Sequence, residues 1–196
     1  MLDQPGKQKL ARGDLCPCVP KNVALPRPGA KTIKVSKVSA TCRPFLSEIS
    51  RRMVRPDGEV DWERYNSINS YQDPALKDKA TRLELALRMW LAGMLTYVMC
   101  VKEEVSLFSV VKGEAENGEI ISRLVWDCRR MNLRSRDPPW VPLGSPAALG
   151  LVELDESTLR GRHLGSFQGD VPDWFYILES EEELWPWFCL QGVAPR

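Results

Sequence analysis

Two short blocks of the sequence combine charged, aromatic and turn-forming residues in patterns that could bind phosphates and a divalent metal. In the first block, Lys112 and Arg123 flank a turn, and an arginine fork beside a lysine point charge can clamp a polyphosphate. In the second block, Asp170 and Asp173 follow an apolar stretch, and hard divalent cations prefer carboxylate oxygens. Each block also has an ordinary structural interpretation: a solvated strand face for the first and a helix N-cap for the second.

The first block lies on a predicted β-hairpin. Residues 105–112 and 120–128 are rich in β-branched and aromatic side chains, and an Asn-Gly turn at residues 117–118 separates them. Because side chains alternate along a strand, we expect Arg123 on the polar face of the hairpin, with Lys112 nearby.

A helix is predicted before the hairpin, over residues 73–100. Asp73 can cap it, and Pro74 suits the first helical position. The apolar residues that recur at spacings of three and four, and that we expect to face the core, are Leu76, Ala80, Leu83, Leu87, Trp90, Leu91 and Met94. The second half of this helix is apolar nearly all round, so we expect it to be buried.

The residues that follow the hairpin turn form a longer pattern. Arg123, Asp127, Arg129 and Asn132 are spaced as Arg-x-x-x-Asp-x-Arg-x-x-Asn. This pattern resembles the end of the fingers hairpin in the reverse transcriptases of retroelements. The resemblance implies that Lys112 and Arg123 close on the incoming triphosphate and neutralise its charge. It also implies that Asp127 and Arg129 hold the hairpin and contact the template.

The second block is similar to the first palm motif of the same family, an apolar strand that ends in Asp-x-x-x-x-aromatic. By this resemblance, Asp170 is the first catalytic aspartate and a ligand of both Mg²⁺ ions, and Val171 gives its carbonyl to one metal. The backbone amides of Asp173 and Trp174 approach the triphosphate. Phe175 is the aromatic residue that excludes a ribose 2′-hydroxyl.

The resemblance covers residues 75–190 and implies an α+β fold, a partial right-hand polymerase with a helix, a long hairpin and the first strand–helix unit of the palm. Residues 56–196 then form the fingers and early palm, and the partners are primer–template nucleic acid and a dNTP. The family's second carboxylate motif, Tyr/Phe-x-Asp-Asp, is missing from the 196 residues. We therefore expect a fragment or degenerate copy of a retroelement RNA-directed DNA polymerase, inactive by itself. The alternative is a non-enzymatic remnant that binds nucleic acid or protein.

Residues 1–55 differ in composition from the rest of the chain. They carry 12 Lys/Arg and 3 Asp/Glu, a net charge of +9, whereas residues 56–196 carry a net charge of −8. Six of the 15 prolines also lie in this segment. We expect a basic, largely disordered arm with at most one strand, at residues 32–38, that grips polyanions. The alternative is a solvated tail without a partner.

Several protein classes are disfavoured by the sequence. The longest apolar stretch, residues 89–101, is too short to cross a bilayer, and the N-terminus has no apolar signal region. The six cysteines do not form a disulfide framework, and with one histidine they do not supply a zinc site. We expect an intracellular protein, cytoplasmic or nuclear, with reduced thiols.

Overall fold

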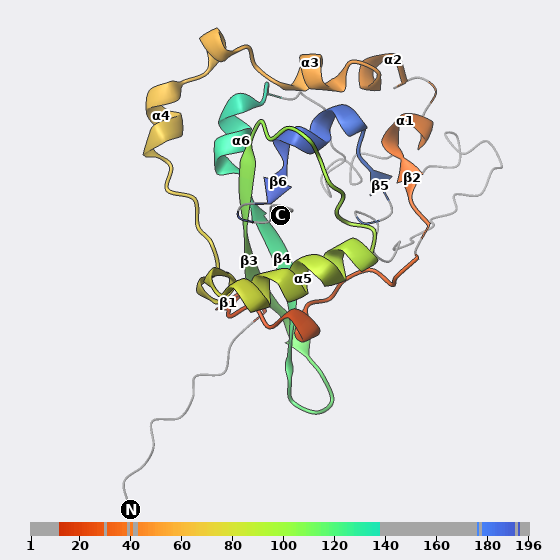
Figure 1. Cartoon of the computed structure of the whole chain (residues 1–196), viewed down its shortest axis with the longest axis vertical. Helices are drawn as coiled ribbons and strands as arrows, with labels where there is room; N and C mark the ends of the chain where they lie inside the picture. The colour runs from red at the N-terminus through yellow and green to blue at the C-terminus, as the bar shows by residue number, and fades with distance from the viewer. Residues whose placement is uncertain are drawn as a thin grey trace, which may run out of the picture.

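A long antiparallel hairpin forms the centre of the molecule; helices pack along it, and its turn projects beyond them (Figure 1). The computed structural model describes residues 12–29, 31–38, 40, 43–137, 176, 178–190 and 192. In chain order the elements are β1 (Leu15–Cys16), η1 (Pro20–Asn22), β2 (Ile33–Lys34), α1 (Val35–Val38), α2 (Arg43–Leu46), α3 (Ile49–Met53), η2 (Asp57–Glu59), α4 (Trp62–Ser67), η3 (Pro74–Lys77), α5 (Lys79–Leu91), β3 (Glu104–Glu114), β4 (Ile120–Asp127), α6 (Arg129–Arg134), β5 (Leu178–Glu179), η4 (Glu182–Trp187) and β6 (Cys189–Leu190). The fold is α+β, which confirms the predicted class.

The hairpin of β3 and β4 is the one predicted from the sequence. Val110 lies opposite Arg123, and this register runs from Ser106 to Val111; it shifts by one residue between Val111 and Gly113. In the turn, the Ala115 amide donates to the Glu119 carbonyl at 2.8 Å. Gly118 has a φ of 80°, a left-handed conformation that glycine adopts without steric cost. The prediction from the Asn-Gly turn is therefore confirmed.

The other edge of β3 is completed by three segments that are far apart in the sequence. β1 pairs with it antiparallel, and β6 pairs with it in parallel at Glu104 and Val105. Between them, the Asp73 amide donates to the Leu107 carbonyl at 2.9 Å. The Asp73 carboxylate also accepts from the Cys18 amide at 2.9 Å and so joins the N-terminal segment to the start of η3. β3 is thus the central strand of the sheet.

The expectation of a disordered arm is wrong for residues 12–29. Cys18 and Val23 are 2 % and 3 % exposed and belong to the main hydrophobic core. Val23 also forms a parallel bridge with Ser122 on the outer edge of β4. The physical reason is that β3 needs hydrogen-bond partners on its second edge, and β1 supplies them. The strand expected at residues 32–38 is only β2, after which the chain turns into α1.

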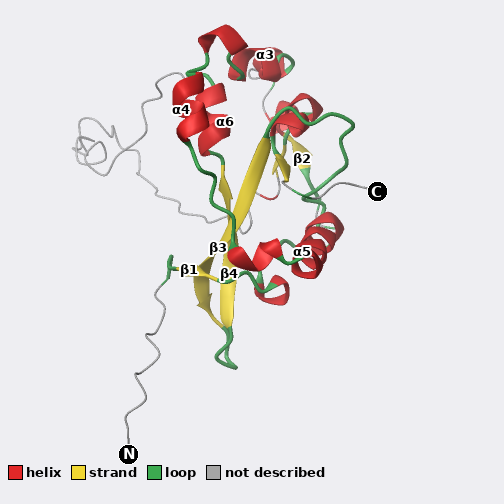
Figure 2. Ribbon diagram, turned by 60° about the vertical axis from the view of Figure 1, so that its left-hand side comes forward, coloured by secondary structure: helices red, strands yellow, loops and turns green. Residues whose placement is uncertain are grey.

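Two hydrophobic clusters lie along the hairpin, one with Leu107 and the other with Val105 of β3. The first cluster, which α5 contributes to, consists of Cys18, Val23, Leu76, Leu85, Met89, Leu107 and Leu124. The second cluster, toward α6 and η4, consists of Val54, Val105, Met131 and Trp187. Figure 2 shows α5 beside the lower part of the hairpin and α3, α4 and α6 together at its other end.

The helix predicted over residues 73–100 is shorter, and its buried face is a different one. Asp73 caps only η3, as expected, and Asp78 then caps α5 by accepting from the Thr81 amide. Met89 is fully buried, whereas Leu87, which we expected in the core, is 55 % exposed. The predicted register is wrong because α5 is apolar on two sides and the hairpin packs against only one. The residues after Leu91 are not helical, and the predicted burial of that half is only partly confirmed: Met89 and Ala92 are buried, whereas Tyr97 and Met99 are 70 % and 105 % exposed.

None of the helices in the described ranges is both long enough and apolar enough to span a membrane.

Candidate nucleic-acid interface

The predicted phosphate-binding cations lie on the half of the hairpin near its turn, which projects away from the helices (Figure 1). Arg123 is exposed opposite Val110, while its neighbour Leu124 points into the core. Lys112 is also exposed, at a β-bulge where β3 has an extra residue between Val111 and Gly113. A bulge bends a strand and changes the direction of its side chains. Within the described part of the chain, neither cation has an ion-pair partner.

Asp127 and Arg129 lie together at the opposite end of β4 and form a two-pronged ion pair. Arg129 Nε donates to Asp127 Oδ1 at 2.8 Å, and Arg129 Nη2 lies 2.7 Å from Oδ2. The Tyr71 amide donates to the same carboxylate at 2.8 Å. The Arg129 hydrogen bond, with help from the Tyr71 and Arg129 amides, lowers the pKa of Asp127 from 3.8 to about 2. The pair therefore stays ionised at any pH above about 3.

These contacts fix the base of the hairpin to the segment that precedes η3. Arg129 also donates to the carbonyl of Asn69 at 3.0 Å, and the Ser106 hydroxyl donates to the carbonyl of Tyr71 at 2.7 Å. The Tyr71 ring meets Phe108 edge to face, with ring centres 5.4 Å apart. The base of the hairpin is thus anchored by side chains, and in the other half the side chains of Lys112 and Arg123 are exposed. A charge on a rigid support loses less entropy when it binds a ligand.

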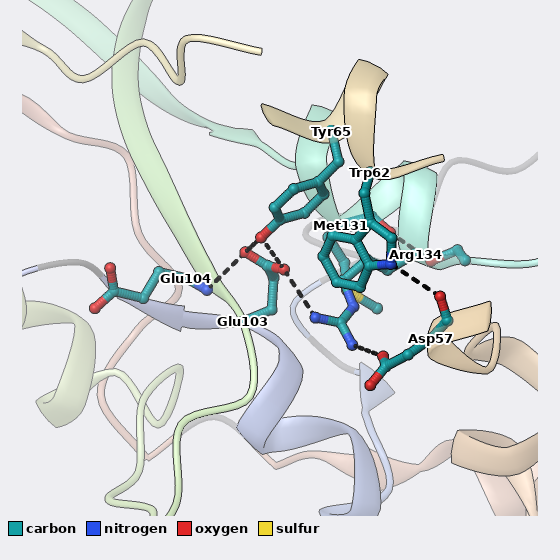
Figure 3. A network of polar contacts seen from close by, with 8 residues as sticks. Asp57, Trp62, Tyr65, Glu103, Glu104, Met131 and Arg134 are labelled. Carbon is teal, nitrogen blue, oxygen red and sulfur yellow. Dashed lines mark hydrogen bonds and ion pairs between the residues drawn. The ribbon is translucent and has the colours of Figure 1, made fainter. Parts of the chain in front are cut away.

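A buried polar network that sequence reasoning missed lies next to the second hydrophobic cluster (Figure 3). The Tyr65 hydroxyl donates to the Glu103 carboxylate, with distances of 2.9 and 2.7 Å to its two oxygens. Arg134 bridges Glu103 at 3.8 Å and Asp57 at 2.8 Å. Burial and the neighbouring carboxylate raise the pKa of Tyr65, so the hydroxyl keeps its proton.

Aromatic rings surround the cations of this network. The Arg134 guanidinium lies 5.2 Å from the Trp62 ring centre and 5.0 Å from that of Trp187. Arg130 lies 4.2 Å from the Tyr65 ring centre. The Glu103 side chain is 4 % exposed and is matched by a hydroxyl and a cation, which is how buried carboxylates are stabilised. The arrangement joins η2, α4, α6 and η4, and we interpret it as structural.

Local sequence patterns contain little sign of this network. Tyr65 and Glu103 are 38 residues apart, so no helical or strand spacing relates them. The available signal is the pair of glutamates at 103 and 104, directly before an apolar strand, which places a carboxylate at the entrance to the core.

The second block lies outside the described residues. Asp170, Val171, Asp173, Trp174 and Phe175 belong to it, and their predicted roles in binding Mg²⁺ and nucleotide stay predictions. Among the residues that the structure does describe, no group of three or more His, Cys, Asp or Glu side chains could hold a metal ion.

No protein-family model, curated protein or solved structure matches this chain.

Proposed function

We propose that this chain is the fingers and early palm of a retroelement reverse transcriptase, and that its β3–β4 hairpin contacts nucleic acid and the triphosphate of an incoming nucleotide. The proposal rests on the motif pattern that runs from Arg123 to Asn132 and on the predicted palm motif at Asp170. The sequence has no pair of adjacent aspartates, whereas two-metal phosphoryl transfer needs carboxylates from both palm motifs. We therefore propose that this chain binds nucleic acid without extending a primer.

The observation that carries the proposal is the contrast between the two ends of the hairpin. Asp127 and Arg129 form an ion pair, so together they have no net charge with which to attract a phosphate. Lys112 and Arg123 are exposed and lack a carboxylate partner in the described ranges. Exposed cations on a projecting, anchored hairpin suit phosphate contacts, which supply most of the affinity in non-specific binding of nucleic acid.

The test is a comparison of two double variants with the same change in charge. Lys112→Gln/Arg123→Gln removes the hairpin cations, and Lys77→Gln/Lys79→Gln removes two exposed cations from η3 and α5. Binding of a fluorescent RNA–DNA primer–template is measured by anisotropy at salt concentrations from about 25 to 200 mM. This range is wide enough to determine the slope of the logarithm of the binding constant against the logarithm of the salt concentration.

The hairpin variant should bind about tenfold more weakly, because it loses charge-assisted contacts, and its salt slope should fall by about one to two units. The control variant should stay within about threefold of the wild-type protein. Equal losses for the two variants would show that the hairpin is no special contact surface.

A primer-extension assay with Mg²⁺ and all four nucleotides tests the second half of the proposal. We expect no template-dependent product. Incorporation that Asp170→Ala abolishes would mean that the chain is a working polymerase and that our assignment of a non-catalytic role is wrong.

A protein contact is the second candidate function, and the outer face of α5 favours it. Leu83, Leu87, Trp90 and Leu91 are each about half exposed on this helix. Light scattering of the wild-type protein and of Leu87→Glu/Trp90→Glu tests it. A larger species that the double variant converts to monomer would favour this candidate.

A further inference from the structure

An acidic segment near the C-terminus lies against part of the basic N-terminal region. Within residues 179–183, four of the five residues are glutamates, and β5 at its start pairs in parallel with β2. We call residues 179–183 the acidic segment. Residues 31–38 and 43–55 form the basic segment; together they contain seven Lys/Arg and one glutamate. The two segments are about 130 to 150 residues apart in the chain, so only the fold brings them together.

Every glutamate of the acidic segment contacts the basic segment. Glu182 forms an ion pair with Lys34 at 3.1 Å, and Glu179 accepts from the Thr32 hydroxyl at 3.1 Å. The two contacts involve Lys34, the last residue of β2, and Thr32, the residue before the strand. The contact with Glu182 also raises the pKa of Lys34, as expected for an ammonium group beside a carboxylate.

The other two glutamates accept hydrogen bonds from main-chain amides. Glu181 accepts from the Ser36 amide at 3.0 Å, and Glu183 accepts from the Ser50 amide at 3.4 Å. Hydrogen bonds from Ser36 lower the pKa of Glu181, so this carboxylate is charged at neutral pH. Amides and lysines are also the groups that bind phosphate oxygens. The acidic segment thus uses donors that a nucleic-acid backbone would use.

Three of the seven cations of the basic segment have no ion pair among the described residues. Lys31, Lys37 and Arg43 are exposed, and Arg51 is shared with Glu48 at 2.9 Å while its side chain stays 80 % exposed. A bound polyanion would therefore find further cations beside those that the acidic segment now contacts. Counterion release favours a long polyanion over four carboxylates, because each additional phosphate contact releases more cations from the nucleic acid.

We propose that the acidic segment is an intramolecular competitor that covers a polyanion-binding surface on the basic segment, and that nucleic acid binds there by displacing it. The inference rests on the proposed function in one respect, that the displacing polyanion is nucleic acid. It adds the basic segment as a second contact surface, separate from the hairpin. The acidic segment lowers the affinity of that surface for nucleic acid. Three of the four contacts are solvent-exposed, so the glutamate side chains can be displaced while the buried Leu184 and Trp187 of η4 stay in the core.

The experiment compares two triple variants that change the net charge equally. Glu181→Gln/Glu182→Gln/Glu183→Gln removes the competing charge but keeps the side-chain size. Glu63→Gln/Glu84→Gln/Glu104→Gln is the control, because these three glutamates are exposed on α4, α5 and the end of β3 far from the hairpin turn. Anisotropy with a fluorescent single-stranded oligothymidylate of about 20 nucleotides, at several salt concentrations, measures affinity.

The acidic-segment variant should bind the oligothymidylate about tenfold more tightly than the control. A tenfold difference means that the acidic segment covers the basic segment in about nine of ten wild-type molecules. Its salt slope should also be steeper. Affinities that agree within about twofold between the two variants would overturn the inference. Circular dichroism verifies folding, and the single variant Glu182→Gln replaces the triple variant if the latter is unfolded.

Hydrogen exchange without any ligand supplies an independent measurement. Amides of Ser36 and Ser50 should exchange faster in the acidic-segment variant, whereas those of β3 should be unchanged. Unchanged exchange at both serines would also overturn the inference.

The two proposals fail in different ways. If the acidic-segment variant gains affinity but adding Lys112→Gln/Arg123→Gln to it changes nothing, the hairpin proposal fails and this inference stands. If the hairpin substitutions weaken binding and the acidic-segment variant equals its control, the reverse holds. If no protein binds either probe at low salt, both are wrong.

Discussion

Substituting alanine for either of two leucines in α5 tests the assignment of the core most directly. Leu85 is 2 % exposed and packs in the first hydrophobic cluster, whereas Leu87 is 55 % exposed on the same helix. Leu85→Ala should cost about 3 kcal/mol, from a range of about 2–5 for buried leucines. Leu87→Ala should change the free energy of unfolding by less than about 0.5 kcal/mol. The helix propensity changes equally in both variants, so the difference between them reports burial.

Urea unfolding followed by circular dichroism measures both values, and the slope verifies that the extent of unfolding is unchanged. For a chain of this size the Leu85→Ala variant should also melt roughly 6–12 °C lower. Leu87→Asp sharpens the test, because a buried unpaired carboxylate would cost several kcal/mol and unfold a marginally stable domain. We expect Leu87→Asp to fold. If Leu87→Ala loses as much stability as Leu85→Ala, the face of α5 that packs on the hairpin has been assigned wrongly.

Three further predictions concern pH, the buried network and the thiols. The folded-state pKa of Asp127, about 2, lies below its ordinary value of 3.8, so its ionisation stabilises the fold above about pH 4 by about 2 kcal/mol. This contribution should disappear as the pH falls from 4 to 2, and urea titrations of Asp127→Asn should lack that part of the pH dependence. Tyr65→Phe removes a hydrogen-bond donor to buried Glu103 and should cost about 1–3 kcal/mol in urea unfolding, while a loss below about 0.3 kcal/mol would contradict the network. Under native conditions, peptide mapping after iodoacetamide treatment should find exposed Cys100 modified at least about a hundredfold faster than Cys18, which is buried and whose pKa is raised by burial; equal rates would mean that the core cluster opens readily.

The sequence predicted the hairpin well because its signals are local. β-branched runs and an Asn-Gly turn act over a few residues, and β3 and β4 form where these signals lie. The register of α5 could not be predicted in the same way. Leu85 and Met89 form one apolar stripe and Leu83 and Leu87 form another, and only the position of the hairpin decides which stripe is buried.

Contacts between distant segments account for the other differences. The residues around Cys18 were interpreted as part of a flexible arm because they are rich in proline, and nothing local indicates that Asp73 and β3 bind them. The same holds for the network of Tyr65, Glu103 and Arg134, which comes from three separate segments. Of the predicted site, the structure describes the hairpin residues, and the palm residues lie outside the described ranges.

The three segments that complete the edge of β3 impose an order on events during synthesis. β1 and Asp73 precede β3 in the chain, so their partners on that edge are covered as soon as the strand emerges. Val105 must wait for Leu190, which at about 5–20 residues per second is made roughly 4–17 s later. A hairpin forms in about 1–10 μs. β3 is therefore folded for nearly all of this interval, while its edge at Val105 has no partner strand. A nascent chain of this protein therefore passes through a period of several seconds in which that end of β3 can pair with another chain, and slower translation over residues 114–190 should increase co-translational aggregation.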